Sequence, residues 1–496
     1  MRFISGQIRN LQKRCFQTRA DYEKWSSRMR ETSMALPSGN TGTAVLSRLQ
    51  RVHARVEAPF LYSVSPISDR LRIFANSGNN AQSSSPYTSM LECMYPLSGI
   101  DHDGDRIPTD DLDILRASIS DFDSWSSFRL AKFYSDVDAL TADVAYRHAS
   151  SAPEADNIAF VTAGHYNSRK IHRTDVSKDI ILRCYPTYVG GSSMEIRTDA
   201  IQTTEDINGA QVENLINVCF TCMVAVDKTT LRPMKNVIPK LSTSITIEDS
   251  NEEHNDPEQD ILQMRVEMAE QHNQIRKERF ASSMQLRGQL SSPPTQEEMF
   301  TIHALHQQIL KGEEDLPRVT QHTYKSSVVV YPEKKNVNGK LFGGFVMEQG
   351  HILAQYAADF YLHHHKSDKS SANATTTKTS RAIPLGLDEA IFLQPVSIGD
   401  HVTFEARVVH STHRTCRVVV TVEVREPSDR HSVPLRSNRL SFLFGGAEFP
   451  SQIVPDTYSE ILMHVDAGRR SAVEGPMDEE VDLILSEKSL KEQANQ

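Results

Sequence analysis

Apolar residues recur at helical spacing in two stretches of the chain. The first stretch predicts an amphipathic helix near 133–146, whose apolar positions i, i+4, i+7 and i+11 are Phe133, Val137, Leu140 and Val144. The second predicts another helix, whose buried stripe is formed by Val346, Gly350, Leu353, Ala357 and Phe360. We therefore expect one long helix in each half of the chain.

Alternating strands follow each predicted helix. Residues 185–201 and 393–409 each show the pattern of a strand, a glycine turn and a second strand. Longer apolar strands follow at 215–226 in the first half, and at 417–424 and 440–443 in the second. A long helix followed by an antiparallel sheet that must bury it predicts an α+β layer architecture, present twice in the chain.

Polar segments divide the chain into parts. The segments with few core-forming side chains, which are typical of linkers and surface loops, are 76–87, 248–260 and 366–380. Residues 261–312 are rich in Gln, Glu, Met and Leu, which predicts two helices with a break near 291–294. These divisions predict a first domain at 85–240, an acidic and helical linker at 241–318, a second domain at 319–450 and a C-terminal tail at 451–496.

The first twenty residues carry a separate signal. They contain five basic residues and no acidic residue, and Ile4, Ile8 and Leu11 fall on one helical face. This pattern is typical of a mitochondrial transit peptide, and Arg14 is placed for processing after Phe16. We expect a transit peptide at 1–16, a mature start no later than about residue 40, and a location in the mitochondrial matrix. A basic N-terminus of a cytosolic protein is the alternative.

Composition narrows the function classes. The 496 residues carry a formal net charge of −10, which gives no electrostatic basis for binding nucleic acid. Six cysteines are too few for a disulfide framework and fit a reducing compartment. No window of about 18 apolar residues is present, so no membrane-spanning helix is predicted. An anionic ligand would need a local basic pocket, because the overall charge repels it.

The segment NVNGKLFGG, residues 336–344, opens the second predicted helix. Gly343 and Gly344 would present backbone N–H groups at a helix N-terminus, where negative charge is stabilised. The spacings of the Walker and Rossmann phosphate loops and of the G-x-S-x-G nucleophile elbow are absent. Close packing of the helix is a plainer explanation of a glycine pair, and these residues alone leave it open.

The same segment resembles a known motif. NVNGKLFGGFVMEQGHILA resembles the helix start of acyl-CoA thioesterases with the hotdog fold, and residues 129–149, RLAKFYSDVDALTADVAYRHA, are similar to their first-domain helix. With the paired halves, the transit peptide and the helical linker, residues 88–460 resemble the mitochondrial double-hotdog branch, acyl-CoA thioesterases 9 and 10. The resemblance implies two tandem hotdog domains, hydrolysis of acyl-CoA to a fatty acid and free coenzyme A, and association into trimers of double hotdogs.

The resemblance also implies a catalytic Asn from one hotdog and a catalytic Asp from the other. The second half keeps Asn336, with Gly343 and Gly344 as oxyanion donors, but has His351 where the family has Asp. The first half keeps an Asp and lacks the glycine pair. One complete site therefore needs Asn336 together with an Asp of the first helix. We expect no metal and no cofactor.

Asp136 and Asp138 are the two main candidates for that carboxylate. Asp136 shares a helix flank with Lys132 and Arg147, which is expected to be charged and solvated. Asp138 lies among small side chains, as a close contact between domains requires. We predict Asp138 as the catalytic residue and keep Asp136 as the alternative, beside the simpler possibility that both are surface carboxylates. Asp138 would act as a general base or as a nucleophile.

Other features leave alternatives open. The chain could be an acyl-CoA-binding or scaffold protein without activity, or a hotdog enoyl-CoA hydratase. Cys219 and Cys222 lie in an apolar run and are predicted as buried core residues rather than a redox pair or a metal site. On second-half strands, the residues predicted either to meet coenzyme A phosphates or to be exposed are Arg407, Arg414 and Arg417.

Overall fold

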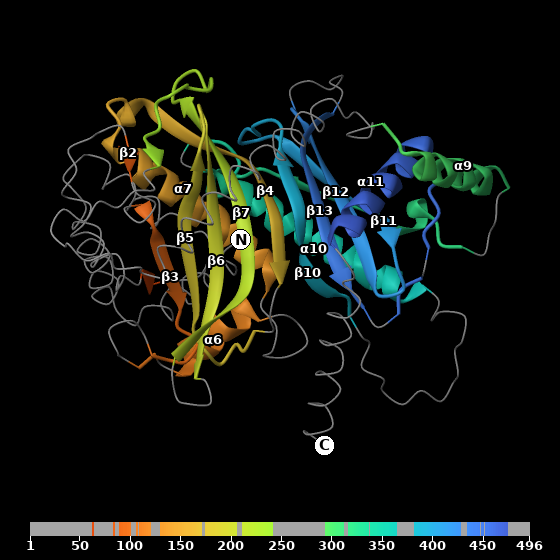
Figure 1. The fold of residues 1–496 in the computed structure, drawn as a ribbon, viewed down its shortest axis with the longest axis horizontal. Helices are drawn as coiled ribbons and strands as arrows, with labels where there is room; N and C mark the ends of the chain where they lie inside the picture. Colours follow the sequence, from red (N-terminus) through yellow and green to blue (C-terminus); the bar gives the residue numbers. More distant parts are fainter. Residues whose placement is uncertain are drawn as a thin grey trace, which may run out of the picture. The chain divides into compact units, whose positions relative to one another are not determined.

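The computed structural model divides the chain into two compact units (Figure 1). Unit 1 comprises residues 1–162 and 171–267, and unit 2 comprises 163–170 and 268–496. The structure describes residues 62–63, 83–84, 89–100, 106–107, 109–120, 129–170, 174–205, 211–241, 293–311, 316–336, 338–364, 381–427, 434–446, 448–450 and 452–474. The predicted transit peptide, the first linker helix and the polar segments at 248–260 and 366–380 lie outside the described residues.

Unit 1 is an antiparallel sheet with one long helix packed against it. In spatial order its strands are β1 (Tyr62–Ser63), β3 (Leu91–Tyr95), β5 (Ile180–Val189), β6 (Ser193–Glu205) and β7 (Gln211–Asp227). The helix α7 (Leu130–His148) packs against β5, β6 and β7. Its predicted apolar stripe is confirmed, because Phe133, Val137, Leu140 and Val144 are all buried.

The smaller elements of unit 1 surround this core. They are the helix α6 (Thr109–Ile119), the 3₁₀ turns Ala149–Ser151 and Ala155–Asn157, and the parallel pair of β2 (Ser83–Ser84) with β8 (Lys240–Leu241). Cys219 and Cys222 are buried in β7, as predicted.

Unit 2 has the same architecture. In spatial order its antiparallel strands are β10 (Ile383–Phe392), β13 (Leu435–Gly445), β12 (Thr415–Arg425), β11 (His401–Ser411) and β9 (Thr323–Val329). β10 also pairs with residues 164–169 of β4 (Ile158–Lys170), so the first half of the sequence supplies a strand to this unit. The helix α10 (Gly343–Leu362) packs against β9, β11, β12 and β13, and the 3₁₀ turns Val319–His322 and Pro332–Lys334 precede it. The predicted α+β class is confirmed.

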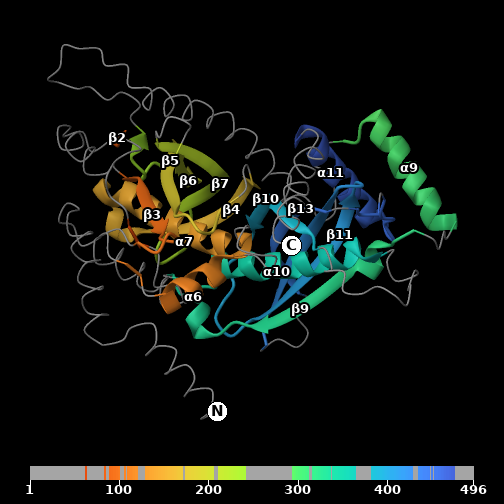
Figure 2. The same cartoon turned by 90° about the horizontal axis from the view of Figure 1, so that it is seen from below.

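Both faces of the unit 2 sheet are covered. Figure 2 shows α10 on one side of the sheet and α11 (Tyr458–Glu474) on the other. On the α10 side, a Cβ at Gly350 would lie 2.2 Å from Leu440 Cδ1, so only glycine lets the helix approach this closely. On the α11 side, Ala467 packs against Val409 and Val419. Burial on both faces explains the long, nearly continuous apolar run of β12.

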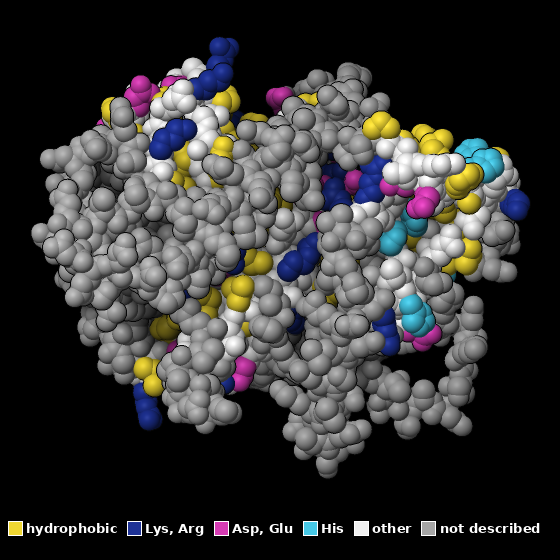
Figure 3. Space-filling view, in the orientation of Figure 1, with side chains coloured by type: hydrophobic (Ala, Val, Ile, Leu, Met, Phe, Trp, Pro, Cys, Tyr) yellow, Lys and Arg dark blue, Asp and Glu magenta, His cyan; other side chains and the backbone are white. Residues whose placement is uncertain are grey.

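The helix α9 (Gln296–Lys311) packs against α11 rather than against the sheet. Their shared apolar cluster consists of Ile302, Leu305, Ile461 and Val465. The opposite side of α9 exposes Met299, Phe300 and Leu310, and Figure 3 shows hydrophobic and histidine side chains gathered there. In the part of the chain that the structure describes, no helix has the length and apolar character needed to cross a membrane.

Two local predictions are wrong. Phe360 was expected in the buried stripe of α10, but it is exposed and contacts Tyr356 and Tyr324 on the open side of the helix. The sheet buries a face of α10 that is rotated from the predicted stripe and includes His351 and Ala354. The strand expected just before Gly399 is a loop between β10 and β11, in which Gly399 has a φ of +94°.

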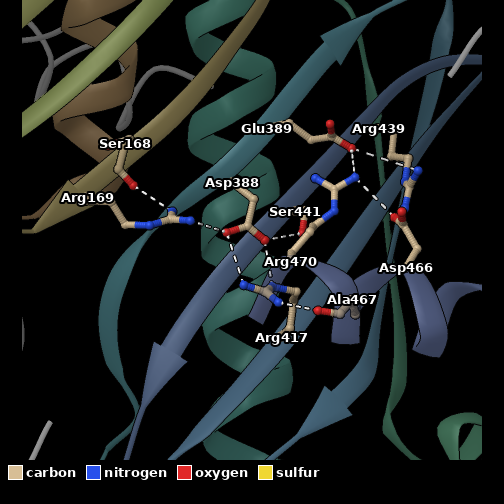
Figure 4. Close-up of polar contacts among 10 residues, drawn as sticks. All are labelled: Ser168, Arg169, Asp388, Glu389, Arg417, Arg439, Ser441, Asp466, Ala467 and Arg470. Carbon is tan, nitrogen blue, oxygen red and sulfur yellow. Dashed lines mark hydrogen bonds and ion pairs between the residues drawn. The ribbon is translucent and has the colours of Figure 1, made fainter. Parts of the chain in front are cut away.

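Charged residues are buried between the unit 2 sheet and α11 (Figure 4). Asp388 on β10 forms an ion pair with Arg417, whose Nε lies 2.7 Å from Oδ2, and it accepts hydrogen bonds from Arg169 Nη2 at 2.9 Å and Ser441 Oγ at 2.8 Å. Arg417 was predicted as a phosphate ligand or an exposed residue, and it is neither, because its side chain is only 1% exposed. Arg169 belongs to β4, so this ion pair holds the strand from the first sequence half against β10.

The charges around Asp388 compensate for its burial. Burial alone would raise the pKa of Asp388, but Arg417 and Arg169 hold it at about 2. A second group lies alongside, in which Arg470 pairs with Glu389 at 2.8 Å and with Asp466 at 3.1 Å. Since a buried ion pair leaves an uncompensated charge when one partner is removed, the network stabilises the unit only when complete.

We expect Asp388→Asn to lower the free energy of unfolding by about 3–5 kcal/mol, because it leaves Arg417 buried beside a neutral group. The double variant Asp388→Leu/Arg417→Met should lose less of the free energy of unfolding than the single variant, because it leaves neither charge of this pair buried alone. The depressed pKa of Asp388 stabilises the fold above about pH 4, and this stabilisation is lost as the pH falls through 2. Urea unfolding at pH 7 and between pH 4 and 2 measures both effects.

Glu298→Gln is the matched control for this prediction. Glu298 is paired with Arg469 in a partly exposed ion pair, which typically contributes about 0–1 kcal/mol. An Asp388→Asn variant that is no less stable than Glu298→Gln would contradict the role assigned to the network.

Candidate functional site

Asp138 lies on the buried side of α7 in unit 1. Asp138 is only 3% exposed, and its Oδ1 accepts a hydrogen bond from Thr162 Oγ1 at 2.8 Å. Thr162 lies on β4 and also contacts Met223 Sδ at 3.6 Å. Thr162 was not predicted from the sequence, in which its one signal is a hydroxyl in the otherwise apolar start of a strand.

Asp136 has a different environment on the same helix. It forms an ion pair with Lys132 Nζ at 2.5 Å and accepts a hydrogen bond from the Tyr95 hydroxyl. The expectation of a solvated flank is wrong, because Asp136 and Lys132 are 4% and 5% exposed. Burial and the neighbouring Asp136 carboxylate raise the pKa of Tyr95. Asp136 is therefore committed to a buried ion pair within unit 1.

The possibility that these are surface carboxylates is also wrong. Asp143, the third acidic residue of α7, is buried like Asp136 and Asp138 and pairs with Arg147 at 3.2 Å. Two of the three carboxylates thus have a cation beside them, while Asp138 has a neutral hydroxyl donor. The buried ion pair with Lys132 gives Asp136 a structural role within unit 1, which favours Asp138 as the catalytic carboxylate.

Asn336 lies in a small hairpin just before α10 in unit 2. The hairpin is closed by an antiparallel bridge between Lys335 and Leu341 and by the Phe342 N–H, which donates to the Lys334 carbonyl at 2.9 Å. Its turn is completed by Gly339, whose φ of +74° only glycine adopts easily.

The side chain of Asn336 builds this turn. Its Oδ1 accepts the backbone N–H groups of Asn338 at 2.9 Å and Lys340 at 3.0 Å, and its own N–H donates to the Lys340 carbonyl at 2.6 Å. Two donors on Oδ1 determine which end of the amide is the oxygen. The Nδ2 group is then the end that is left to donate to a ligand.

Gly343 and Gly344 begin α10 immediately after the hairpin. Phe342 is the N-cap residue and supplies no side-chain cap, and the first turn contains no acidic residue. The first-turn N–H groups of a helix have no acceptor within the helix, so this terminus is suited to a negatively charged oxygen. The hairpin places Asn336 beside it within unit 2, since Phe342 is bonded back to Lys334.

His351 occupies the position in α10 that Asp138 occupies in α7, because each lies eight residues after the start of its helix. His351 is buried, and its ring contacts Phe442 at 5.3 Å and Phe444 at 5.8 Å on β13. It is therefore part of the apolar core of unit 2. Of the predicted residues, Asn336, Gly343 and Gly344 lie together in unit 2, and Asp138 belongs to unit 1.

Comparison with curated proteins identifies relatives. The chain is 23% identical over 362 residues to the mitochondrial acyl-coenzyme A thioesterase 9 of Bos taurus, which covers 69% of this chain and 71% of that one. It is 22% identical over 381 residues to the mitochondrial acyl-coenzyme A thioesterase 9 of Homo sapiens, which covers 73% and 75%. The mitochondrial acyl-coenzyme A thioesterase 10 of Mus musculus is 23% identical over 360 residues. The chain is thus similar to mitochondrial acyl-CoA thioesterases 9 and 10 over about 70% of its length. The predicted resemblance is thereby confirmed.

Two solved structures illustrate the similarity to known folds. An acyl-CoA hydrolase from Bacillus cereus has a TM-score of 0.27 and 18% identity, and covers 37% of this chain and 99% of its own. An oleoyl thioesterase (putative) from Lactobacillus plantarum has a TM-score of 0.32 and 9% identity, and covers 73% and 98%. No family model matches the chain.

We expect Asp136→Asn and Asp138→Asn to differ in stability. Asp136→Asn leaves the buried Lys132 ammonium without its carboxylate and should lower the free energy of unfolding by about 3 kcal/mol or more. Asp138→Asn keeps an oxygen that accepts from Thr162 and should cost less than about 1.5 kcal/mol. Urea unfolding of the two variants tests this, and equal losses would contradict the different roles assigned to the two carboxylates.

Proposed function

We propose that the chain is an acyl-CoA thioesterase that hydrolyses acyl-CoA to a fatty acid and free coenzyme A at one composite site. Asp138 of unit 1 is the catalytic carboxylate, and Asn336 with the Gly343 and Gly344 amides of unit 2 forms the other side. The observation that carries this proposal is that the units keep complementary parts. The equivalent helix position holds Asp138 in α7 and the core residue His351 in α10. The helix α10 follows the Asn336 hairpin and begins with a glycine pair, whereas α7 begins with Leu130 and Ala131.

Hydrolysis of a thioester needs a nucleophile and polarisation of the carbonyl. With Asp138 as general base, a water oxygen bonds to the carbonyl carbon as its proton moves to Asp138, and the C–S bond then breaks. Coenzyme A leaves as a thiolate and takes up a proton, and the acyl group leaves as a carboxylic acid. In the nucleophilic alternative, Asp138 first forms an anhydride that water opens.

The groups of unit 2 would stabilise the oxyanion. Asn336 Nδ2 is the donor end of the amide, because Oδ1 already accepts two backbone N–H groups. The N-terminal amides of α10 supply further donors without rearrangement. Loss of one such donor typically raises the barrier by about 2.7–4 kcal/mol.

Thr162 would position Asp138. Its hydroxyl donates to Oδ1 at 2.8 Å, and this hydrogen bond restricts the rotation of the carboxylate that acts as the base.

The names of the relatives and the N-terminal pattern support a mitochondrial location. The relatives carry the word mitochondrial in their names, and residues 1–16 have the composition of a transit peptide. We propose that the protein lies in the mitochondrial matrix and that, as the family resemblance implies, it assembles as a trimer of tandem hotdog chains.

We expect the purified chain to release free thiol from acyl-CoA thioesters, measured with a thiol-reactive dye over a panel of acyl lengths. Asp138→Asn should abolish the release, because it removes the base with little change in volume. Binding of acyl-CoA without thiol release by the wild type would identify a binding or scaffold protein. Loss of an enoyl-CoA double bond without thiol release would identify a hydratase.

We expect Asn336→Asp to separate the two roles of Asn336, which are to hold the turn through Oδ1 and to donate to the substrate through Nδ2. Asp keeps an oxygen for the Asn338 and Lys340 N–H groups but has no Nδ2 donor, so kcat should fall about 100-fold while unfolding is little changed. Asn336→Ala removes both contributions and should lower activity and stability together. Wild-type turnover in Asn336→Asp would contradict the donor role.

Mixing Asn336→Asp chains with Asp138→Asn chains should restore no thioesterase activity, because both groups of the site come from one chain.

A further inference from the structure

The hairpin that carries Asn336 is also rich in lysine. Lys334, Lys335 and Lys340 lie within seven consecutive residues, in a chain whose formal net charge is −10. An acyl-CoA substrate carries several phosphate charges on its nucleotide end, and the overall field of the protein repels it. Binding therefore requires a local excess of positive charge near the reacting groups.

The register of the hairpin sorts these lysines onto two faces. The Lys335–Leu341 bridge places Lys334 opposite Phe342 and Asn336 opposite Lys340. Directly opposed residues share a face, and neighbours along a strand alternate between faces. Lys340 therefore shares a face with Asn336, whereas Lys335 lies on the other face. Lys334 is the last residue of the 3₁₀ turn Pro332–Lys334, and its side chain lies over Phe345 at the start of α10.

The charges of Lys334 and Lys340 are not neutralised by carboxylates in the described part of unit 2. Lys340 Nζ donates to the neutral Ser397 hydroxyl at 3.1 Å, and Lys334 Nζ lies 5.3 Å from the ring centroid of Phe345 in the first turn of α10. By contrast, Lys325 on β9 pairs with Glu405 at 3.3 Å. The two hairpin ammonium groups thus add to the positive end of α10 instead of being cancelled.

We propose that Lys334 and Lys340 bind the phosphate groups of the coenzyme A part of the substrate, beside the site that Asn336 helps to form. This assignment rests on the proposed thioesterase function. It makes the hairpin a bifunctional element, in which Asn336 faces the thioester and the two lysines hold the anionic end of the same molecule. Ser397 and Phe345 hold the two lysine side chains in place before the substrate arrives.

The test compares two thioesters with the same acyl group, one on coenzyme A and one on N-acetylcysteamine, which has no phosphate. In Lys334→Gln/Lys340→Gln, KM for the acyl-CoA should rise about tenfold with kcat within about twofold of wild type. The kinetic constants for the N-acetylcysteamine ester should be unchanged. Raising the salt concentration should raise the KM of the wild type for acyl-CoA and affect the variant less.

Lys335→Gln is the matched control, because it removes the same charge from the opposite face of the same hairpin. It should leave KM for acyl-CoA within about twofold of wild type. An equal rise in KM for Lys335→Gln, or no rise in the double variant, would overturn the assignment. Wild-type chain that releases no thiol from any acyl-CoA would instead overturn the proposed function itself.

Adenosine 3′,5′-bisphosphate separates a substrate subsite from an independent nucleotide site. It should inhibit the wild type competitively with acyl-CoA, and its inhibition constant should rise in Lys334→Gln/Lys340→Gln. Non-competitive inhibition that is lost in the double variant would show a separate nucleotide site and would overturn the assignment.

Discussion

Burial of acidic residues beneath a long helix is the constraint that shapes this protein. Because α7 lies against its sheet along most of its length, each carboxylate on it must find a partner inside unit 1. Asp136 meets this requirement with Lys132 and Tyr95, and Asp143 does so with Arg147. Asp138 accepts a hydrogen bond from the Thr162 hydroxyl. The three carboxylates of one helix thus have different partners.

The same position in α10 shows the opposite solution. His351 packs between the rings of Phe442 and Phe444, so unit 2 uses this point for its core. The glycine at position 350 lets the helix come close enough to the sheet for that packing. At the start of the same helix, unit 2 has the turn built by Asn336 and the glycine pair. The two units thus share one architecture but differ in the residues at equivalent positions of their long helices.

The second face of the unit 2 sheet is polar beneath α11. The buried charges of Asp388 on β10 and Arg417 on β12 compensate each other, and Arg169 and Ser441 also contact the Asp388 carboxylate. Arg169 comes from β4, so the network ties a strand of the first sequence half to β10 by charge as well as by backbone hydrogen bonds. A buried network of this kind selects one register, because a shifted strand would leave a charge unpaired.

Local patterns in the sequence determined the elements. The spacing of Phe133, Val137, Leu140 and Val144 requires a helix with one buried face, and NVNGKLFGG marks a turn followed by a helix start. These features depend on residues close together in the chain, which is why the α+β class and the turn and helix start at Asn336, Gly343 and Gly344 could be predicted. The predicted stripe of α10 was wrong at Phe360, because which side of a helix is buried depends on the sheet it meets.

Tertiary structure alone decided how the charges are used. Helix spacing places Asp136 beside Lys132 but does not determine whether the pair is exposed to solvent or buried. Its burial comes from β5, β6 and β7 and from Tyr95, which is 41 residues away in the sequence. In the same way, Thr162 reaches Asp138 only because β4 returns beside α7, and Arg417 became a core residue only when α11 covered it. The sequence determined which groups exist and on which element each lies. Long-range packing determined their solvent exposure and their partners, and those two quantities set whether a carboxylate or a guanidinium supports the fold or the chemistry.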